Sequence, residues 1–330
     1  MSGLLLVAVM FGIMLALMAA RIPIAAAMFF AGAYGYVMQT GWPGFSNYLN
    51  AQAFARFASY DLSVIPLFIL MGNFATQGGI SRALFTFAAG ITRRFKGGMA
   101  MAAVLASAAF GAICGSSVAT AATITGVALP ELRRHGYSGR LATGTLAAAG
   151  TLGILIPPSV PLVIYAILTE QNIAKLFAAA MIPGLIAMIG YMVVIAVYVR
   201  LVPGHAPDTD DDIPGVTRAS TLSIMPILGI FLIVFGGIYG GFFTPTEGAA
   251  VGAAATLISA VLRRELSWSG FKECFYATAE SSGMIFLIFL GADVMSGALA
   301  LSGATNHLSA FVNGLGWSPF AIVAAILLFY

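Results

Sequence analysis

Long apolar runs separated by short polar turns dominate the chain. A transmembrane helix needs about 20 apolar residues, and this measure predicts spans over residues 3–20, 24–40, 61–78, 140–168, 176–201, 222–242, 245–262 and 281–301. A final run begins near Pro319 and is still apolar at Tyr330. We therefore expect an all-α polytopic membrane protein, and we expect this chain to be a fragment of a longer one.

Residues 98–132 form two apolar stretches, each too short to span comfortably, that join at Cys114 and Gly115. Basic side chains flank both outer ends: Arg93, Arg94, Lys96, Arg133, Arg134 and Arg140. Loops rich in Lys and Arg stay cytoplasmic, so both ends are expected on one side of the membrane. The pattern favours a re-entrant hairpin with its Gly-Ser tip at mid-membrane. Two ordinary spans or one kinked helix are the alternatives, since Gly and Ser are common in membrane helices.

A second interruption, GILIPPS, runs from Gly153 to Ser159. Like GAICGSSVATAATITG from Gly111 to Gly126, it breaks an apolar helix with Gly, Ser or paired Pro. Backbone groups freed at membrane depth must face protein, ions or water rather than lipid. Two such breaks favour a protein that moves a solute.

Two segments differ from the spanning pattern. SRALFTFAAGITRRFKGG, residues 81–98, sets apolar positions against basic ones and predicts an amphipathic helix at the interface. Residues 203–218 are the most hydrophilic stretch, have no periodicity and predict a solvated linker; its acidic residues are Asp208, Asp210, Asp211 and Asp212.

Composition agrees with the pattern of runs. Of 330 residues, 60% are hydrophobic and 8% charged, and the mean hydropathy is +0.98, whereas soluble domains carry about 25% charged residues. The net charge of +3 comes from inter-helix turns, so it reports topology and does not indicate nucleic-acid binding. The first apolar run, Leu4 to Ala20, has no basic residues before it, and we interpret it as a transmembrane helix rather than a signal peptide.

Cysteine and histidine give no indication of a metal site or a disulfide framework. Cys114 and Cys274 are far apart, and Cys114 lies inside an apolar run. The three histidines fall in turns or polar segments, and neither HExxH nor a Cys-His spacing occurs: His135, His205 and His307.

The two halves of the chain share three landmarks in the same order. At a separation of about 220 residues, Pro23 aligns with Pro245, Gly72 with Gly291, and Gly97 with Trp317. The first copy contributes five predicted crossings, and the hairpin adds none. Because this number is odd, the second copy is inverted. Inverted repeats with discontinuous helices are an architecture of secondary transporters.

The motifs GSSVATAA, GILIPPS, PLFILMG and FTPTEGAA, with Gly136-Tyr137 and IPG at Ile182–Gly184, closely resemble the large (permease, DctM-like) membrane subunit of tripartite ATP-independent periplasmic (TRAP) transporters. The resemblance covers essentially all of the chain. It implies an elevator-type, sodium-coupled importer of organic acids such as C4-dicarboxylates or sugar acids, in the bacterial inner membrane. It also implies a small four-helix membrane subunit and a periplasmic substrate-binding protein as partners, and about a hundred further residues with a second hairpin and a second broken helix.

On this resemblance the chain divides into scaffold helices of repeat 1, a helix with its interfacial arm, a transport-domain hairpin with its broken helix, a further helix, a cytoplasmic linker, and an incomplete repeat 2. The corresponding ranges are 1–60, 61–97, 98–170, 171–202, 203–220 and 221–330.

Sodium needs several hard oxygens and little net charge, which carbonyls and hydroxyls around helix breaks supply. The candidate ion-binding residues at the two breaks are Gly115, Ser116, Ser117, Thr120, Thr151, Gly153, Ile156, Pro157, Pro158 and Ser159. The alternative is that each hydroxyl bonds back to the preceding helical turn. For the substrate carboxylate we expect half-helix N-termini aided by Ser117 or Thr120. Asn73 either joins them or bonds between helices.

Three acidic residues lie in or near apolar runs. Asp61 and Glu247 stand at expected helix starts, where capping is the favoured role. Asp293 is deeper, and an intramembrane acid is a functional candidate, here for a second ion site or a proton path.

Other functions were weighed against the sodium-coupled importer. A proton-coupled transporter or a passive channel has the same architecture, and sodium dependence of uptake separates them. An intramembrane hydrolase with Ser116 or Ser117 as nucleophile needs a base and oxyanion donors. No histidine lies inside a predicted span and GxSxG is absent, so we do not expect an enzyme.

Overall fold

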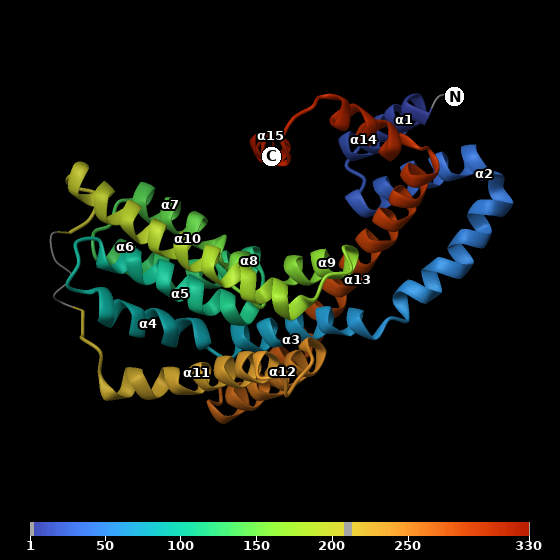
Figure 1. Cartoon of the computed structure of the whole chain (residues 1–330). Coiled ribbons are helices and arrows are strands. Elements are labelled where there is room, and N and C mark those ends of the chain that lie inside the picture. The colour runs from blue at the N-terminus through green and yellow to red at the C-terminus, as the bar shows by residue number, and fades with distance from the viewer. Residues whose placement is uncertain (1–2, 208–212, 330) are drawn as a thin grey trace. The chain divides into compact units, whose positions relative to one another are not determined.

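The computed structural model describes residues 3–207 and 213–329, apart from the side chains of residues 52–57. Asp208, Asp210, Asp211, Asp212 and Tyr330 lie outside the described residues. Every regular element described is a helix (Figure 1). The helices are α1 (Gly3–Ala19), α2 (Ile24–Phe57), η1 (Tyr60–Ser63), α3 (Val64–Gln77), α4 (Ile80–Thr92), α5 (Gly98–Cys114), α6 (Ser117–Arg134), α7 (Gly139–Gly150), α8 (Leu152–Leu155), α9 (Val160–Leu168), α10 (Ile173–Leu201), α11 (Arg218–Tyr239), α12 (Pro245–Leu262), α13 (Trp268–Leu301), α14 (Ala304–Gly314) and α15 (Pro319–Phe329).

The chain forms two compact units. Unit 1 comprises Met1–Ser59 and Gly283–Tyr330. Its core joins α1, α2 and the second half of α13 through five buried apolar side chains: Leu6, Met10, Ala31, Met295 and Ala298. A Cβ at Gly32 would lie 2.6 Å from the backbone nitrogen of Met295, so a glycine there lets α2 and α13 approach closely.

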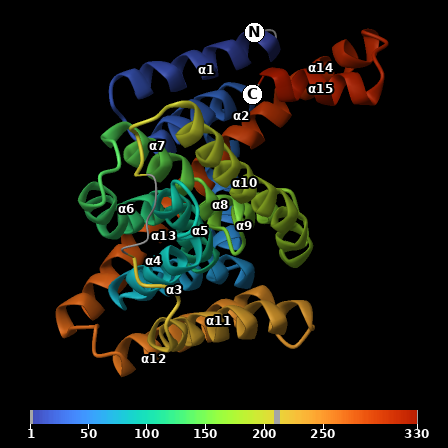
Figure 2. The same cartoon turned by 90° about the vertical axis from the view of Figure 1, so that its left-hand side faces the viewer.

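Unit 2, Tyr60–Ser282, is built around α5. Figure 2 looks at this unit from one end and shows α5 among α3, α4, α6, α8 and α10. Nearly every α5 residue is buried, including Phe110 and Ile113. A helix that is apolar all round belongs in an interior, so the first limb of the predicted hairpin forms the core of unit 2.

Helices α3 and α12 pack against each other and support the inner end of α5. On α12, Gly252 lies against the Met71 side chain, and Ala260 lies against Gly78 at the end of α3. A Cβ at Gly72 would lie 3.0 Å from Cα of Cys114. Small residues at both contacts therefore bring α3 next to the tip of the hairpin.

The helices lie close to the predicted spans, with three additions. Helix α2 continues to Phe57 beyond a kink at Gly41 (φ 74°, ψ 172°), where the sequence predicts the helix to end. Helix α13 begins at Trp268 instead of residue 281, and α14 was not predicted. The first half of α13 was missed because Lys272 and Glu280 interrupt its apolar run, and α14 was missed because it is short and contains the polar residues Asn306 and His307.

Helix α4 has the amphipathic form predicted for residues 81–98. Its buried face carries Leu84, Phe85 and Ala88, whereas Arg82 is exposed. The pair η1–α3 and α4 is bent by 67°. The predicted solvated linker is in part packed: Ala206 and Ile213 are buried, and the amide of Ser138 donates to the carbonyl oxygen of His205 (2.9 Å).

Among the described residues, four helices are long and apolar enough to cross a membrane: α10, α11, α12 and α13. Three bent helix pairs also qualify if each pair is one span: Tyr60–Gln77 with Ile80–Thr92, Gly139–Leu155 with Val160–Leu168, and Ala304–Gly314 with Pro319–Phe329. Together with the composition, this makes the chain a multi-pass membrane protein. Helix α5, with 17 residues, is about 26 Å long at 1.5 Å per residue, which is short of the roughly 30 Å hydrocarbon core.

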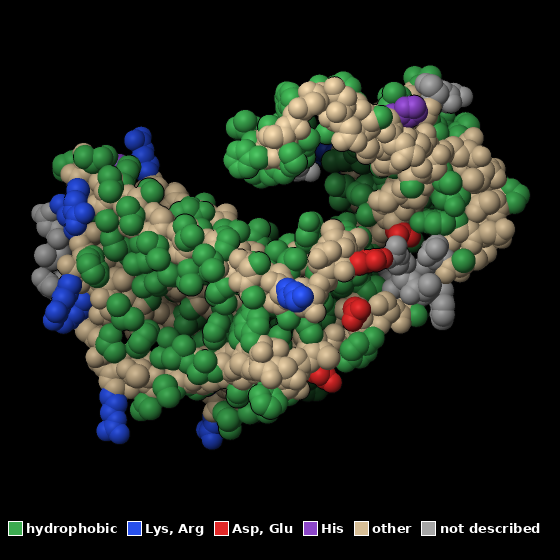
Figure 3. Space-filling model, in the orientation of Figure 1, with side chains coloured by type: hydrophobic (Ala, Val, Ile, Leu, Met, Phe, Trp, Pro, Cys, Tyr) green, Lys and Arg blue, Asp and Glu red, His purple; other side chains and the backbone are tan. Residues whose placement is uncertain are grey.

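Lys and Arg side chains gather at one end of unit 2, on the left in Figure 3, where α4 and α6 end and α11 begins. The helix ends and turns here carry Arg93, Arg94, Lys96, Arg133, Arg134, Arg140, Arg200 and Arg218. Both outer ends of the α5–α6 pair lie there, as the basic flanks of residues 98–132 predicted.

Candidate functional site

A left-handed glycine turns the chain between α5 and α6. Gly115 has φ +65°, and its amide donates to the carbonyl oxygen of Gly111 (2.9 Å), which closes the end of α5. Ser116 begins α6 as its N-cap, and its hydroxyl accepts from the amide of Ala119 (3.3 Å). A positive φ favours glycine and an N-cap favours serine, so the pair Gly115-Ser116 specifies a reversal at this point.

The second break separates α7 from α9. Helix α7 ends at Gly150, the short α8 follows Thr151, and residues Ile156 and Ser159 have extended backbone on either side of Pro157-Pro158. The two halves of this broken helix, Gly139–Leu155 and Val160–Leu168, are bent by 41°. A discontinuous helix at this position is what GILIPPS predicted.

The two breaks meet in unit 2. The amide of Val160, at the start of α9, donates to the carbonyl oxygen of Gly115 (3.2 Å). A Cβ at Gly115 would lie 2.8 Å from the carbonyl oxygen of Pro158. A Cβ at Gly111 would lie 2.6 Å from Cα of Gly153. The structure therefore brings the two groups of predicted residues together, with backbone against backbone.

Two buried hydroxyls at this junction are unsatisfied. Thr120 and Ser159 are fully buried, and neither side-chain oxygen has a hydrogen-bond partner of normal geometry among the described residues. The Thr120 hydroxyl lies beside the Cys114 thiol, which is a weak donor and acceptor. Ser159 is the N-cap of α9, yet its side chain makes no capping bond. Buried polar groups are normally hydrogen-bonded, and these two are exceptions. Their lone pairs are therefore free to accept a hydrogen bond or to bind a cation.

Thr151 differs from these two residues. Its hydroxyl donates to the carbonyl oxygen of Ala148 (2.7 Å) and lies 3.0 Å from the hydroxyl oxygen of Tyr191. A threonine hydroxyl has one proton, so Tyr191 is the donor in the second bond. Thr151 is also exposed. The backward hydrogen bond considered as an alternative is therefore found for Thr151 and not for Thr120 or Ser159.

Backbone carbonyl groups add further oxygens at the second break. Pro157, Pro158 and Pro161 have no amide hydrogen to donate. The carbonyl groups four residues earlier, on Gly153, Ile154 and Pro157, consequently have no helical donor. Ser117 is partly buried at the first position of α6.

Asn73 bonds between helices, which is one of its two predicted roles. Its side-chain amide donates to the hydroxyl of Thr278 (2.9 Å) and to the carbonyl oxygen of Cys274 (3.3 Å), and so joins α3 to α13. Thr278 was not predicted as a partner of Asn73, because it lies before the predicted span at 281–301. Gly111 and Tyr191 were likewise missed as parts of the site.

The three acidic residues have distinct positions. Glu247 forms a capping box with Thr244: its carboxylate accepts from the Thr244 amide (2.8 Å), and its own amide donates to the Thr244 hydroxyl (3.2 Å). The predicted capping role of Glu247 is thus confirmed. Asp61 lies exposed in the first turn of η1. Asp293 belongs to unit 1, where the hydroxyl of Tyr48 donates to its carboxylate (2.9 Å).

Comparison with known proteins gives a consistent result. The family model described as "Tripartite ATP-independent periplasmic transporter, DctM component" matches residues 11–330. A C4-dicarboxylate TRAP transporter large permease protein DctM of Pseudomonas aeruginosa is 34% identical over 286 residues, which cover 84% of this chain and 65% of that protein. A protein of the same name from Rhodobacter capsulatus is 31% identical, over 97% of this chain and 76% of that protein. The ectoine TRAP transporter large permease protein TeaC of Halomonas elongata is 31% identical, over 85% of this chain and 64% of that protein. The chain thus spans about two thirds to three quarters of the length of these relatives.

Proposed function

Because the chain belongs to the family of DctM components of tripartite ATP-independent periplasmic transporters, we propose that it serves as the permease subunit of a sodium-coupled importer of organic acids. The observation that supports this most directly is the meeting of two helix breaks around the unsatisfied, fully buried hydroxyls of Thr120 and Ser159. The relatives are named as transport proteins rather than enzymes.

Sodium is the cation that suits these oxygens. Hydroxyl oxygens of Thr120 and Ser159, with carbonyl groups freed by the prolines, provide hard neutral donors. Ca²⁺ sites in proteins draw on carboxylates, and residues 111–120 and 151–161 contain no Asp or Glu. In this proposal the residues at both breaks hold the ion, and Thr151 contributes least because its hydroxyl is already bonded twice.

An anionic substrate is supported by helix ends at the same junction. Helices α6 and α9 both begin there, at Ser117 and Val160. A helix N-terminus carries about half a positive charge and free amide groups. The partly buried hydroxyl of Ser117 lies in the first turn of α6. The negative charge of a carboxylate bound at these helix ends compensates the positive charge of a sodium ion bound beside it. We therefore propose that the sodium ion and the carboxylate are transported together.

The inverted repeat and the elevator movement are part of the same proposal. Helices α4 and α14 both follow a left-handed glycine, Gly79 (φ +67°) and Gly303 (φ +69°), and Gly97 (φ +82°) and Gly316 (φ +64°) lie just before α5 and α15. This recurrence supports two copies of one unit. The tight backbone contact between hairpin and broken helix supports their movement as one body.

Orientation and partners complete the proposal. The basic end of unit 2 faces the cytoplasm by the positive-inside rule, in the bacterial inner membrane. A small membrane subunit and a periplasmic binding protein that delivers substrate are proposed from the family to which the chain belongs.

Uptake of labelled organic acids into proteoliposomes tests the proposal. The permease is reconstituted with its membrane partner, binding protein is added outside, and flux is measured with an inward sodium gradient or with potassium at the same ionic strength. Accumulation that requires sodium and the binding protein is the expected result. Flux that ignores the sodium gradient would reject sodium coupling, and accumulation driven by a pH gradient instead would indicate proton coupling.

A further inference from the structure

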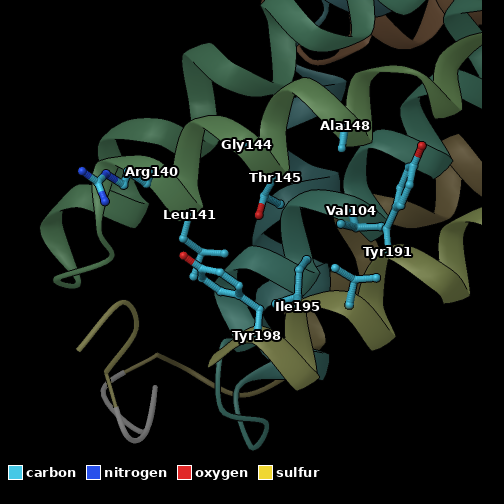
Figure 4. Close-up of a pocket in the computed structure, with 10 residues that line it drawn as sticks. Val104, Arg140, Leu141, Gly144, Thr145, Ala148, Tyr191, Ile195 and Tyr198 are labelled. Atoms are coloured by element: carbon cyan, nitrogen blue, oxygen red, sulfur yellow. The ribbon is translucent and has the colours of Figure 1, made fainter. Parts of the chain in front are cut away.

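A groove of about 260 Å³ lies between α5, α7 and α10 in unit 2. Figure 4 shows its lining: Leu141, Gly144 and Ala148 come from α7, Ile195 and Tyr198 from α10, and Val104 from α5. The lining is almost wholly apolar. Among the described residues that line the groove, the one charged residue is Arg140, at the end where α7 begins, with its guanidinium group extending outward.

The dimensions of the groove match one leaflet of a bilayer. From Arg140 to Ala148 is eight residues of α7, about 12 Å at 1.5 Å per residue. Half of a hydrocarbon core of about 30 Å is roughly 15 Å. A linear apolar group that enters beside Arg140 and extends to Ala148 therefore covers most of the depth of one leaflet.

Charge at the entrance selects the head group. Arg140 belongs to the basic end of unit 2, where α6 ends with Arg133 and Arg134 and α10 ends next to Arg200 (Figure 1). An arginine near the membrane surface attracts an anionic head group by about 1 kcal/mol, and of these arginines Arg140 is the one that lines the groove. An apolar groove with a cation only at its outer end fits a molecule that has an acyl chain and an anionic head.

We propose that this groove binds one acyl chain of an anionic phospholipid, with its phosphate at Arg140. The chain lies along Gly144 and Ala148, and its inner end is next to Tyr191. Because Tyr191 donates a hydrogen bond to Thr151 (3.0 Å), directly before α8, the bound lipid supports the wall of the broken helix from the membrane side.

Native mass spectrometry of the permease, purified in mild detergent and titrated with phosphatidylglycerol, tests this site. Wild-type protein is expected to retain one phosphatidylglycerol in preference to phosphatidylcholine. Arg140→Gln is expected to weaken retention about fivefold, the effect of one arginine at an anionic surface. Gly144→Leu fills the groove and is expected to abolish retention of phosphatidylglycerol. A Cβ at Gly144 meets no atom within 4 Å, so the larger side chain enters open space.

Arg133→Gln is the matched control, because Arg133 is an exposed arginine of the same basic end outside the groove lining. It is expected to bind lipid as the wild type does. Equal lipid retention in wild type, Arg140→Gln and Gly144→Leu would overturn the proposal, whether or not the Leu variant is less stable. Equal retention of phosphatidylcholine, or displacement of the lipid by inorganic phosphate, would also overturn it.

Discussion

The amide of Val160 donates a hydrogen bond of 3.2 Å to the carbonyl oxygen of Gly115. The donor begins the helix after the paired prolines, and the acceptor is the left-handed residue at the hairpin tip. This bond joins two interruptions that are more than forty residues apart in sequence. Substitutions at this junction are therefore expected to affect both segments together.

Removal of either unsatisfied hydroxyl is expected to weaken sodium binding without lowering stability in the absence of sodium. For Thr120→Val and Ser159→Ala we expect unfolding without sodium to be unchanged or to need more heat, because an unsatisfied buried polar group costs about 1–3 kcal/mol. Sodium binding stabilises a protein by about 2.7 kcal/mol at one hundred times Kd. A tenfold weaker site loses about 1.4 kcal/mol of that gain. Thermal unfolding in sodium chloride and in choline chloride measures both effects.

Thr143→Val is the control for these two variants. Its hydroxyl is exposed and donates to the carbonyl oxygen of Gly139 within α7 (2.7 Å), so its loss should leave the sodium response intact. A sodium response equal to that of the wild type in both Thr120→Val and Ser159→Ala contradicts the proposed cage.

Gly153 has no space for a side chain. A Cβ there would collide with the hydroxyl of Thr120 and lie 2.7 Å from the carbonyl oxygen of Ser116. We expect Gly153→Ala to destabilise the protein by about 1–3 kcal/mol, the usual cost of overpacking, and to weaken sodium binding. Gly126→Ala, on α6 with no atom within 4 Å of its Cβ, should be neutral or stabilising by up to about 1 kcal/mol. Similar unfolding temperatures for the two alanine variants would show that the contact is not tight.

Asn73 and Thr278 are expected to act as a pair that holds α3 to α13. Asn73→Leu and Thr278→Val should each destabilise the protein, and the double variant should show a coupling energy of about 1 kcal/mol. Sodium-dependent stabilisation and substrate uptake should persist in both single variants. Loss of substrate binding in Asn73→Leu, with stability retained, would restore the alternative that Asn73 contacts the substrate.

The capping box at the start of α12 is predicted to matter for stability and not for transport. Thr244→Ala should lower stability by about 1 kcal/mol, the usual cost of losing an N-cap hydroxyl. Glu247→Gln should be close to wild type, because Gln also completes a capping box. Uptake rates per folded protein should be equal in all three proteins. A slower rate in Glu247→Gln, despite normal stability, would assign that carboxylate a role in transport.

Sequence pattern was sufficient for most of the long helices and for the location of both breaks. Apolar length identifies spans because the hydrocarbon core requires it, and Gly115-Ser116 and Pro157-Pro158 interrupt a helix through local backbone chemistry. The same criterion missed the first half of α13, whose charged residues shorten the apolar run. It also missed α14, which has only 11 residues and contains the polar residues Asn306 and His307.

The sequence could not predict which hydroxyl groups have a hydrogen-bond partner. Thr120 and Thr151 are the same residue type, each in or beside a helix next to a break. Only the fold places Tyr191 beside Thr151 and leaves Thr120 without a normal partner. Likewise the contact of Gly111 with Gly153 depends on how two helices cross, and a single sequence carries no signal for that crossing.

Gly111 and Gly153 meet without a side chain between them. Most contacts between helices can absorb a small shift, because side chains change rotamer and take up the displacement. The contact between the backbones of Gly111 and Gly153 has no side chain that can change rotamer. We therefore expect a small shift of one segment to displace the other by the same amount. In the proposed site, ion binding at the hairpin tip is therefore expected to move the broken helix with it, and one added methyl group at the contact of Gly111 with Gly153 is expected to weaken this coupling.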